Sequence, residues 1–478
     1  MEKKNVILVI VIALLLLGIG AFFAINLMRG RVYERIPDPN ALTTHSYLEI
    51  QSTETPVQEV ESPAQEAETE KQTLESASQS EPGLDPEIVA KMYQIEEQVR
   101  TLRQLETETR IPRMILSNAE LKERVLNDFL EEYEEEDELE DVRIMSMFGL
   151  LPKDFALLDF YLDLYSEQIA GFYDTEEKAM YVIGDAGFGG MERFTYAHEY
   201  VHVLQDAVFG FEDNLKYTDE YCKEDTERCL ALQSLIEGDA TLTQSMWFQN
   251  YATKKDFQDL QNFYSSYKSP ILDNAPEYMK SDFTFPYLYG LQFVQTLYSE
   301  GGYELIDKAY IEQQPISSEQ IMHPEAYPDD VPNNPELPDL AASLGDDWEL
   351  IQKNVMGEWS TYLVLAKGYE ATYRLQDGIA QAAAEGWGGD RYVVLRNEAA
   401  GEYLIVAVYN WDSSADASEA LQAFRNYSNL RFGTAAAGDQ WQNDGIFSSL
   451  YQTRPDSFVW ILAESQEALS AAQALLHN

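Results

Sequence analysis

Residues 198–202 read His-Glu-Tyr-Val-His, and this pattern constrains the chain more than any other segment does. On a helix, His198 and His202 lie one turn apart on the same face, so both imidazoles can bind one metal ion. Glu199 then lies beside the ion, where it can accept a proton from a water molecule. A glycine-rich loop precedes the segment and Gly210 follows it, which favours a helix between them. The alternative is a pair of core histidines on an ordinary amphipathic helix.

A catalytic zinc site needs three protein ligands and one open position. The chain has only five histidines, and His323 is the only further one in the part that we expect to fold. The metzincin class would require glycine at position 205 and histidine at position 208. The chain has Gln205 and Val208 there, so that class is excluded. A carboxylate on a second helix is the remaining common solution.

The segment 231–244, ALQSLIEGDATLTQ, has helical periodicity and carries Glu237 and Asp239. With this second segment the sequence resembles the gluzincin metallopeptidases, a zincin group that includes thermolysin and the aminopeptidases. Their first helix carries His-Glu-x-x-His, and their second donates a glutamate ligand, often within Glu-Gly-x-Ala. The resemblance implies Zn²⁺ as the cofactor and Glu199 as the general base. It implies three zinc ligands: His198, His202 and Glu237.

Two aspartates are candidates to contact these ligand side chains and hold them in place. Thermolysin-like members have an aspartate four residues after the second histidine, which Asp206 matches, and such a carboxylate can orient a ligand imidazole. Many gluzincins also have an aspartate four residues after the glutamate, where this chain has Thr241. Asp239 lies two residues after the glutamate instead, and it stays open as an alternative ligand or a supporting group. The resemblance covers residues 150–250 well and residues 90–330 loosely.

The oxyanion of a peptide-cleaving reaction needs a hydrogen-bond donor besides the metal. His323 is the one spare imidazole, and we take it as a candidate catalytic residue. The tyrosines Tyr196, Tyr287 and Tyr289 are alternatives, and the structural interpretation of His323 is a loop histidine. Zincins run an edge strand beside the substrate groove, and the polar turn 174–178 between two short apolar runs predicts a hairpin ahead of the metal helix.

The N-terminus carries a long apolar segment. Residues 6–25 hold no charged side chain, and a helix of that length spans about 30 Å, the thickness of a bilayer core. The run is too long for a cleaved signal peptide, so residues 1–30 are predicted to be a single-pass membrane anchor. Residues 31–88 are acidic and poor in aromatic residues, which indicates a disordered linker. We expect the catalytic part to be extracytoplasmic.

Charge and cysteine content narrow the partners. Lys+Arg 33 against Asp+Glu 83 gives a net charge of −50, which excludes a nucleic-acid-binding surface. No glycine pattern of a nucleotide site is present. The two cysteines, Cys222 and Cys229, are expected to form a disulfide if the domain is exported. The expected partners are a protein or peptide substrate and the membrane.

The predicted fold class is α+β. After the anchor and the linker, residues 89–330 are expected to form a mostly helical zincin-like domain with a small edge sheet. Residues 331–374 are expected to connect it, through a helix or a helix pair over 348–373, to a small α+β sandwich at 375–478. There, strand and helix patterns alternate.

The sequence therefore predicts a membrane-anchored zinc metallopeptidase. A zincin-shaped binding or scaffolding protein without catalysis is the first alternative. A zinc amidase acting on a cell-wall amide is the second, because zinc and base are the same in both hydrolases.

Overall fold

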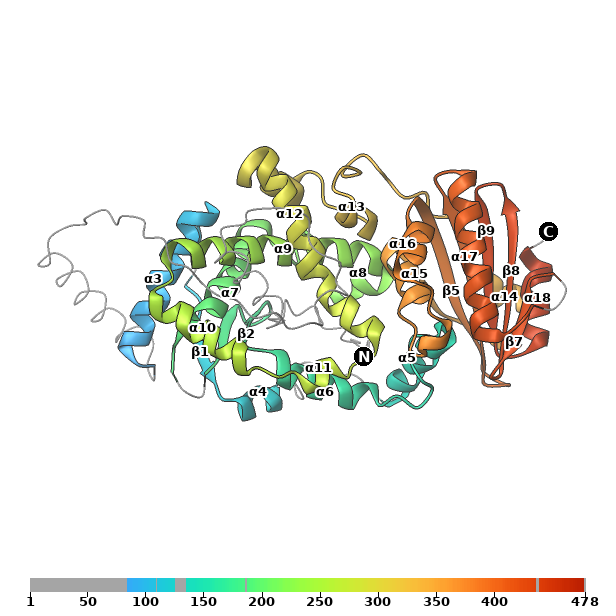
Figure 1. Ribbon diagram of the computed structural model, residues 1–478, viewed down its shortest axis with the longest axis horizontal. Helices are drawn as coiled ribbons and strands as arrows, with labels where there is room; N and C mark the ends of the chain where they lie inside the picture. Colours follow the sequence, from blue (N-terminus) through green and yellow to red (C-terminus); the bar gives the residue numbers. More distant parts are fainter. Residues whose placement is uncertain (1–83, 109, 125–134, 185–186, 436–437, 477–478) are drawn as a thin grey trace, which may run out of the picture.

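The computed structural model describes residues 84–108, 110–124, 135–184, 187–435 and 438–476. Figure 1 shows an elongated arrangement with a largely helical part (blue to yellow) at one end and a large sheet (orange to red) at the other. The predicted α+β class is confirmed at this level.

The predicted membrane anchor and most of the acidic linker lie outside the described residues. Among the residues that are described, no helix is both long enough and apolar enough to cross a bilayer.

The helices of the first part are α3 (Pro86–Arg103), α4 (Asn118–Arg124), α5 (Glu135–Phe148), α6 (Leu157–Gln168), α7 (Gly190–Phe209), α8 (Asp219–Glu224), α9 (Thr226–Tyr251), α10 (Lys254–Ser266), α11 (Pro270–Asp273), α12 (Glu277–Ile311) and α13 (Ser318–Met322). The long helix α9 lies between α7 and α12 and packs against both (Figure 1). Asp225 caps its N-terminus, because the side chain accepts a hydrogen bond from the backbone N–H of Arg228.

Helices α9 and α12 touch through glycine. A Cβ atom on Gly290 of α12 would lie 2.1 Å from the carbonyl oxygen of Ser234, and one on Gly238 of α9 would lie 2.2 Å from the carbonyl oxygen of Gly290. Both contacts are far shorter than van der Waals contact and involve backbone atoms, which cannot swing aside. Only glycine, which has no side chain, therefore fits at these two positions. Gly238 directly follows Glu237.

A small three-stranded sheet packs beside α7. Its strands are β1 (Arg113–Leu116), β2 (Gly171–Asp174) and β3 (Ala179–Ile183), in the order β1-β3-β2. The expected hairpin is present, because β2 and β3 pair antiparallel with Phe172 opposite Tyr181. Within the described residues β2 pairs only with β3, so it is an edge strand, and it contacts α7.

The second part is a six-stranded antiparallel sheet with helices on both faces. Its strands are β4 (Trp348–Asn354), β5 (Trp387–Asn397), β6 (Glu402–Trp411), β7 (Gln440–Asn443), β8 (Ile446–Arg454) and β9 (Ser457–Ala463), in the order β4-β5-β6-β9-β8-β7. Its helical segments are α14 (Leu340–Leu344), α15 (Gly357–Ala366), η3 (Ala371–Tyr373), α16 (Asp377–Ala384), α17 (Ser414–Phe432) and α18 (Gln466–Leu476).

Strand β9 is buried on both faces of the sheet, because helices pack against each face. Trp460 packs against Phe424 of α17 on one face, with 5.3 Å between ring centroids. Ile461, the next residue, joins the core cluster that also holds Leu340 of α14 and Leu469 of α18. Since successive side chains of a strand point to opposite faces, an unbroken apolar run such as this one is buried on both.

The sheet begins earlier in the chain than expected. The segment 348–373, predicted as a connecting helix or helix pair, contributes the strand β4 before the helix α15. β4 pairs only with β5 among the described strands, and most of its residues are half-buried. An edge strand of this kind lacks the continuous apolar run that marks the central strands, so its local pattern does not distinguish it from a helix.

Cys222 and Cys229 form a disulfide that links α8 to the first turn of α9. Both half-cystines are buried. The bridge fastens the start of the helix that carries Glu237.

The glycine crossing gives the first test. We expect Gly290→Ala to lower the free energy of unfolding by about 3 kcal/mol, because the methyl group has no space and the two helices must move apart. Gly378→Ala is the matched control: Gly378 lies in α16, and a Cβ there meets nothing within 4 Å. We expect the control to be neutral or to stabilise by about 0.5 kcal/mol. Denaturant unfolding of both variants measures the difference, and equal stabilities would contradict the close crossing.

Candidate metal centre

The helix α7 carries the first motif into the core of the helical part. It begins after Gly189, whose backbone N–H donates to the Glu192 carboxylate, and it ends at Gly210 with a φ of 67°. His198, Glu199 and His202 are at most 2 % exposed. Three ionisable side chains on one buried turn are costly unless they have partners or bind an ion.

Helix α9 brings Glu237 against the two histidines. Glu237 Oε2 lies 3.1 Å from His198 Nε2 and 3.6 Å from His202 Nε2, and Glu237 is fully buried. One ligand atom from each of the three residues lies within 4.8 Å of the other two. The residues that the sequence assigned as ligands therefore converge on one point from two helices, and this group could hold a metal ion.

Two polar atoms of the group are buried without a hydrogen-bond partner among the described residues. They are His202 Nε2 and Glu237 Oε1. Buried polar atoms are rarely left in that condition, and each costs free energy of folding. A cation bound by the imidazoles and the carboxylate would compensate these atoms together.

Burial favours the neutral form of both imidazoles, which is the form that binds a metal ion. It lowers the pKa of His198 and of His202 to about 4, so both rings are neutral at neutral pH. Burial raises the pKa of Glu237 to about 7, against the lowering effects of His202 and of a hydrogen bond to Tyr287. Burial and the charge of Glu237 raise the pKa of Glu199 well above its usual range.

Gln205 fixes the tautomer of His202. Its amide nitrogen lies 3.0 Å from the carbonyl oxygen of Ile236, 2.9 Å from Asp239 Oδ2 and 3.0 Å from the hydroxyl of Tyr310. Because these contacts occupy the NH₂ group, the amide oxygen faces His202 Nδ1 at 2.8 Å. Nδ1 must then carry the proton, which leaves the lone pair of Nε2 directed at Glu237.

Asp239 is not part of the ligand group. Its carboxylate forms a fully buried ion pair with Arg103 of α3 at 2.8 Å and accepts the hydrogen bond from Gln205. The sequence left open whether Asp239 is a ligand or a supporting group. The geometry corresponds to a supporting group. That support reaches His202 through Gln205.

Asp206 faces away from the ligand imidazoles. It accepts hydrogen bonds from the hydroxyl of Tyr173 at 2.8 Å, from Lys178 at 2.6 Å and from the backbone of Phe211 at 3.1 Å. It therefore fastens the β2–β3 hairpin to α7. The contact with His202 that the resemblance implied for Asp206 is made by Gln205 instead. The available signal was the i, i+3 spacing of Gln205 from His202, which puts both on one helix face.

Glu199 lies beside the edge strand β2. A Cβ atom on Gly171 would lie 2.8 Å from Thr195 Cγ2 and 3.6 Å from Glu199 Cγ. Glycine at this position thus lets the strand backbone approach the turn of α7 that carries Glu199.

His323 does not join the group. Its Nε2 lies 2.9 Å from Glu358 Oε1 of α15, at the end of α13. The same short helix is bound through Ser318 to Glu227, ten residues before Glu237 and therefore about 15 Å along α9. The candidate catalytic role of His323 has no geometric support. Of the alternative tyrosines, Tyr196 is occupied by Glu96 and Arg113, whereas Tyr287 hydrogen-bonds Glu237.

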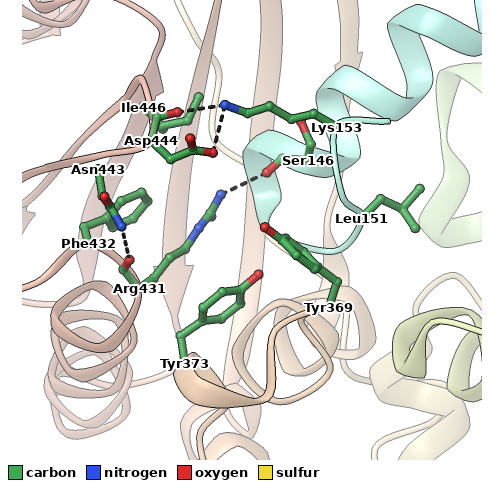
Figure 2. Close-up of a pocket in the computed structure, with 10 residues that line it drawn as sticks. All are labelled: Ser146, Leu151, Lys153, Tyr369, Tyr373, Arg431, Phe432, Asn443, Asp444 and Ile446. Carbon is green, nitrogen blue, oxygen red and sulfur yellow. Dashed lines mark hydrogen bonds and ion pairs between the residues drawn. The ribbon is translucent and has the colours of Figure 1, made fainter. Parts of the chain in front are cut away.

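A pocket drawn in Figure 2 lies at the junction of the two parts of the molecule. Arg431 of α17 donates to the carbonyl oxygen of Ser146 at 2.9 Å, and Lys153 pairs with Asp444 at 2.9 Å. None of its lining residues belongs to the ligand group. We assign the pocket no part in the chemistry of the metal centre.

Comparison with known proteins identifies only the second part of the chain. A family model described as a domain of unknown function (DUF8575) matches residues 349–473, from β4 to α18. No curated protein and no solved structure matches the chain. The His198–His202–Glu237 group lies wholly outside the matched residues.

The role of Gln205 can be tested by metal titration. We expect Gln205→Leu to weaken Zn²⁺ or Co²⁺ binding by about 10- to 100-fold, because His202 loses the acceptor that fixes its tautomer. Tyr310→Phe is the control, since it removes one of several acceptors around the Gln205 amide and leaves the bond to His202. An affinity of Gln205→Leu equal to that of Tyr310→Phe would contradict the role.

The raised pKa of Glu237 sets a pH dependence for metal binding. Below pH 7 a proton competes with the metal for this carboxylate, so the affinity should fall about tenfold per pH unit. Above pH 7 the affinity should level off. The two histidines should not contribute between pH 5 and 7, because their pKa values lie near 4. Chelator competition across pH 5–8 measures the profile, and a flat affinity between pH 7 and 5 would count against it.

Proposed function

We propose that the chain is a membrane-anchored zinc metallopeptidase with its catalytic part outside the cytoplasm. One observation carries the proposal: a buried His198–His202–Glu237 group with a further buried glutamate, Glu199, on the same turn of α7. A core that needed only structural histidines would gain nothing from two further buried carboxylates.

The donor set supports zinc among the common metals. Two imidazoles and one carboxylate suit zinc, whereas calcium and magnesium prefer oxygen donors alone. Three protein ligands leave the fourth position open. Bound zinc would act as a Lewis acid and lower the pKa of water in that position.

Glu199 is the proposed general base. It takes a proton from the attacking water and passes it to the leaving amine. Burial and the charge of Glu237 raise the pKa of Glu199 well above its usual range. A cation held by the three ligands would neutralise the charge of Glu237 and favour the ionised form of Glu199, which is the form that can accept a proton.

Tyr287 is the proposed donor to the oxyanion. It lies on α12 and hydrogen-bonds Glu237, so its hydroxyl is close to the ligand group. A phenol at this point can donate to an oxygen that gains negative charge in the transition state. His323 is not proposed for this role, because it pairs with Glu358 instead.

The edge strand β2 supports a peptide as the substrate. An extended peptide can add to a free strand edge through backbone hydrogen bonds, and β2 runs beside Glu199. Docking of this kind places the peptide backbone, rather than one side chain, next to the base.

A non-catalytic binding protein and a cell-wall amidase remain as outcomes of the test. We expect the full-length chain to bind about one zinc ion, and His198→Ala/His202→Ala to bind none. Glu199→Gln should keep the metal and lose activity on a peptide library by about 10²- to 10⁴-fold, since it removes only the base. Thermal unfolding of each variant checks that it folds.

Undiminished cleavage by Glu199→Gln would remove this residue from the mechanism. Absence of metal in the wild-type chain would favour the binding protein. Bound metal without peptide cleavage, but with hydrolysis of a cell-wall amide, would favour the amidase.

A further inference from the structure

A second group of acidic side chains gathers where the two parts of the molecule meet. Glu319 comes from α13, Asp330 from the loop that follows it, and Asp412 directly follows β6. One carboxylate oxygen from each lies within 4.8 Å of the other two. Three segments far apart in the sequence thus direct carboxylates at one point, and none of the three residues belongs to the His198–His202–Glu237 group.

Glu319 is buried there without a partner. It is 5 % exposed, and its Oε2 has no hydrogen-bond partner among the described residues. A second buried carboxylate, Glu358, lies close by and uses one oxygen to pair with His323, while its other oxygen is unpartnered. Burial, together with repulsion from Glu358, Asp330 and Asp412, raises the pKa of Glu319 to about 9.

Protein cations do not neutralise the three carboxylates. Within the part of the chain that the structure describes, no lysine or arginine forms an ion pair with Glu319, Asp330 or Asp412. Like charges at this separation cannot all ionise without a counter-charge. Either a proton or a bound cation must therefore compensate them.

The surrounding backbone is held in place on both sides. Gln320 of α13 donates to the carbonyl oxygen of Asp330 at 2.7 Å. The loop then binds the sheet, because Asn333 donates to the carbonyl oxygen of Gly388 at 2.7 Å and accepts from Asn410 at 2.8 Å. The backbone N–H of Asp412 donates to Gly386 at 3.0 Å. The carboxylates thus belong to a braced junction.

Three carboxylate donors are better suited to calcium than to zinc or magnesium. All three are carboxylates, and without nitrogen or sulfur donors the group does not favour zinc. Calcium takes 6–8 oxygen ligands at about 2.3–2.6 Å in flexible geometry, so one ion can span oxygens up to about 4.8 Å apart. Magnesium requires shorter distances and near-ideal octahedral geometry. Asp412 is exposed, so water can reach the group and complete the coordination.

We propose that Glu319, Asp330 and Asp412 form a calcium site that fastens α13 and its loop to the C-terminal sheet. The proposal is independent of the zinc centre, since the two groups share no residue.

Thermal unfolding of the full-length chain tests the site. The chain is stripped of metal, supplied with equimolar zinc, and unfolded with increasing Ca²⁺ or with Mg²⁺. We expect Ca²⁺ to raise Tm by about 5 °C at one hundred times its Kd, and Mg²⁺ to raise it much less. The same Ca²⁺ response is expected in His198→Ala/His202→Ala.

Substitutions separate this site from other acidic surfaces. Glu319→Gln should abolish the Ca²⁺ response and unfold no earlier than the wild type without Ca²⁺, because it removes a buried repulsion. Asp412→Asn changes an exposed residue and should weaken Ca²⁺ binding at least tenfold. Asp329→Asn, an exposed neighbour with the same change in charge, should keep the full response.

An unchanged Tm of the wild-type chain in Ca²⁺ would overturn the proposal and show that a proton neutralises Glu319. An equal response to Mg²⁺ would overturn the choice of calcium. A full Ca²⁺ response in both Glu319→Gln and Asp412→Asn would place the site elsewhere.

Discussion

The buried guanidinium of Arg103 holds the helical part of this protein together. It comes from α3 and pairs with Asp239 of α9 at 2.8 Å and with Asp307 of α12 at 2.6 Å, while Gln205 of α7 donates to the same Asp239. Removing either charge of a buried pair leaves the other uncompensated, which costs several kcal/mol. Four helices are therefore positioned by one network, and the last member of that network orients His202. A change at Arg103 or Asp239 would therefore disturb both the packing of the helices and the orientation of His202.

Helical periodicity explains how much of the site could be predicted. The spacing of His198 and His202 and the second helix with Glu237 were enough to identify a convergent group. They were not enough to say which neighbour supports it. Gln205 and Asp206 are adjacent in sequence, but they point about 100° apart around the helix axis, so one faces α9 and the other the hairpin. Which of the two supports a ligand depends on the packing of elements distant in sequence.

Contacts between segments distant in sequence also explain why the predictions for His323 and for β4 were wrong. His323 was selected because it was the one spare imidazole, yet its partner Glu358 lies in the first helix after β4, which no local pattern links to it. The central strand β9 has a continuous apolar run because both its faces are covered. The edge strand β4 shows no comparable run, since only one of its sides is paired. Long-range pairing, rather than propensity, decides both cases.

The glycine contact between α9 and α12 has a consequence for the ancestry of this protein. Enlarging Gly238 or Gly290 requires the helices to separate, and a single compensating change on the partner cannot restore backbone-to-backbone contact. Any homologue that retains this crossing must therefore keep both glycines through divergence, however far its surface drifts. Requiring both of them beside the five-residue metal motif gives a longer signature. That signature can separate true descendants from chains that match the motif by chance.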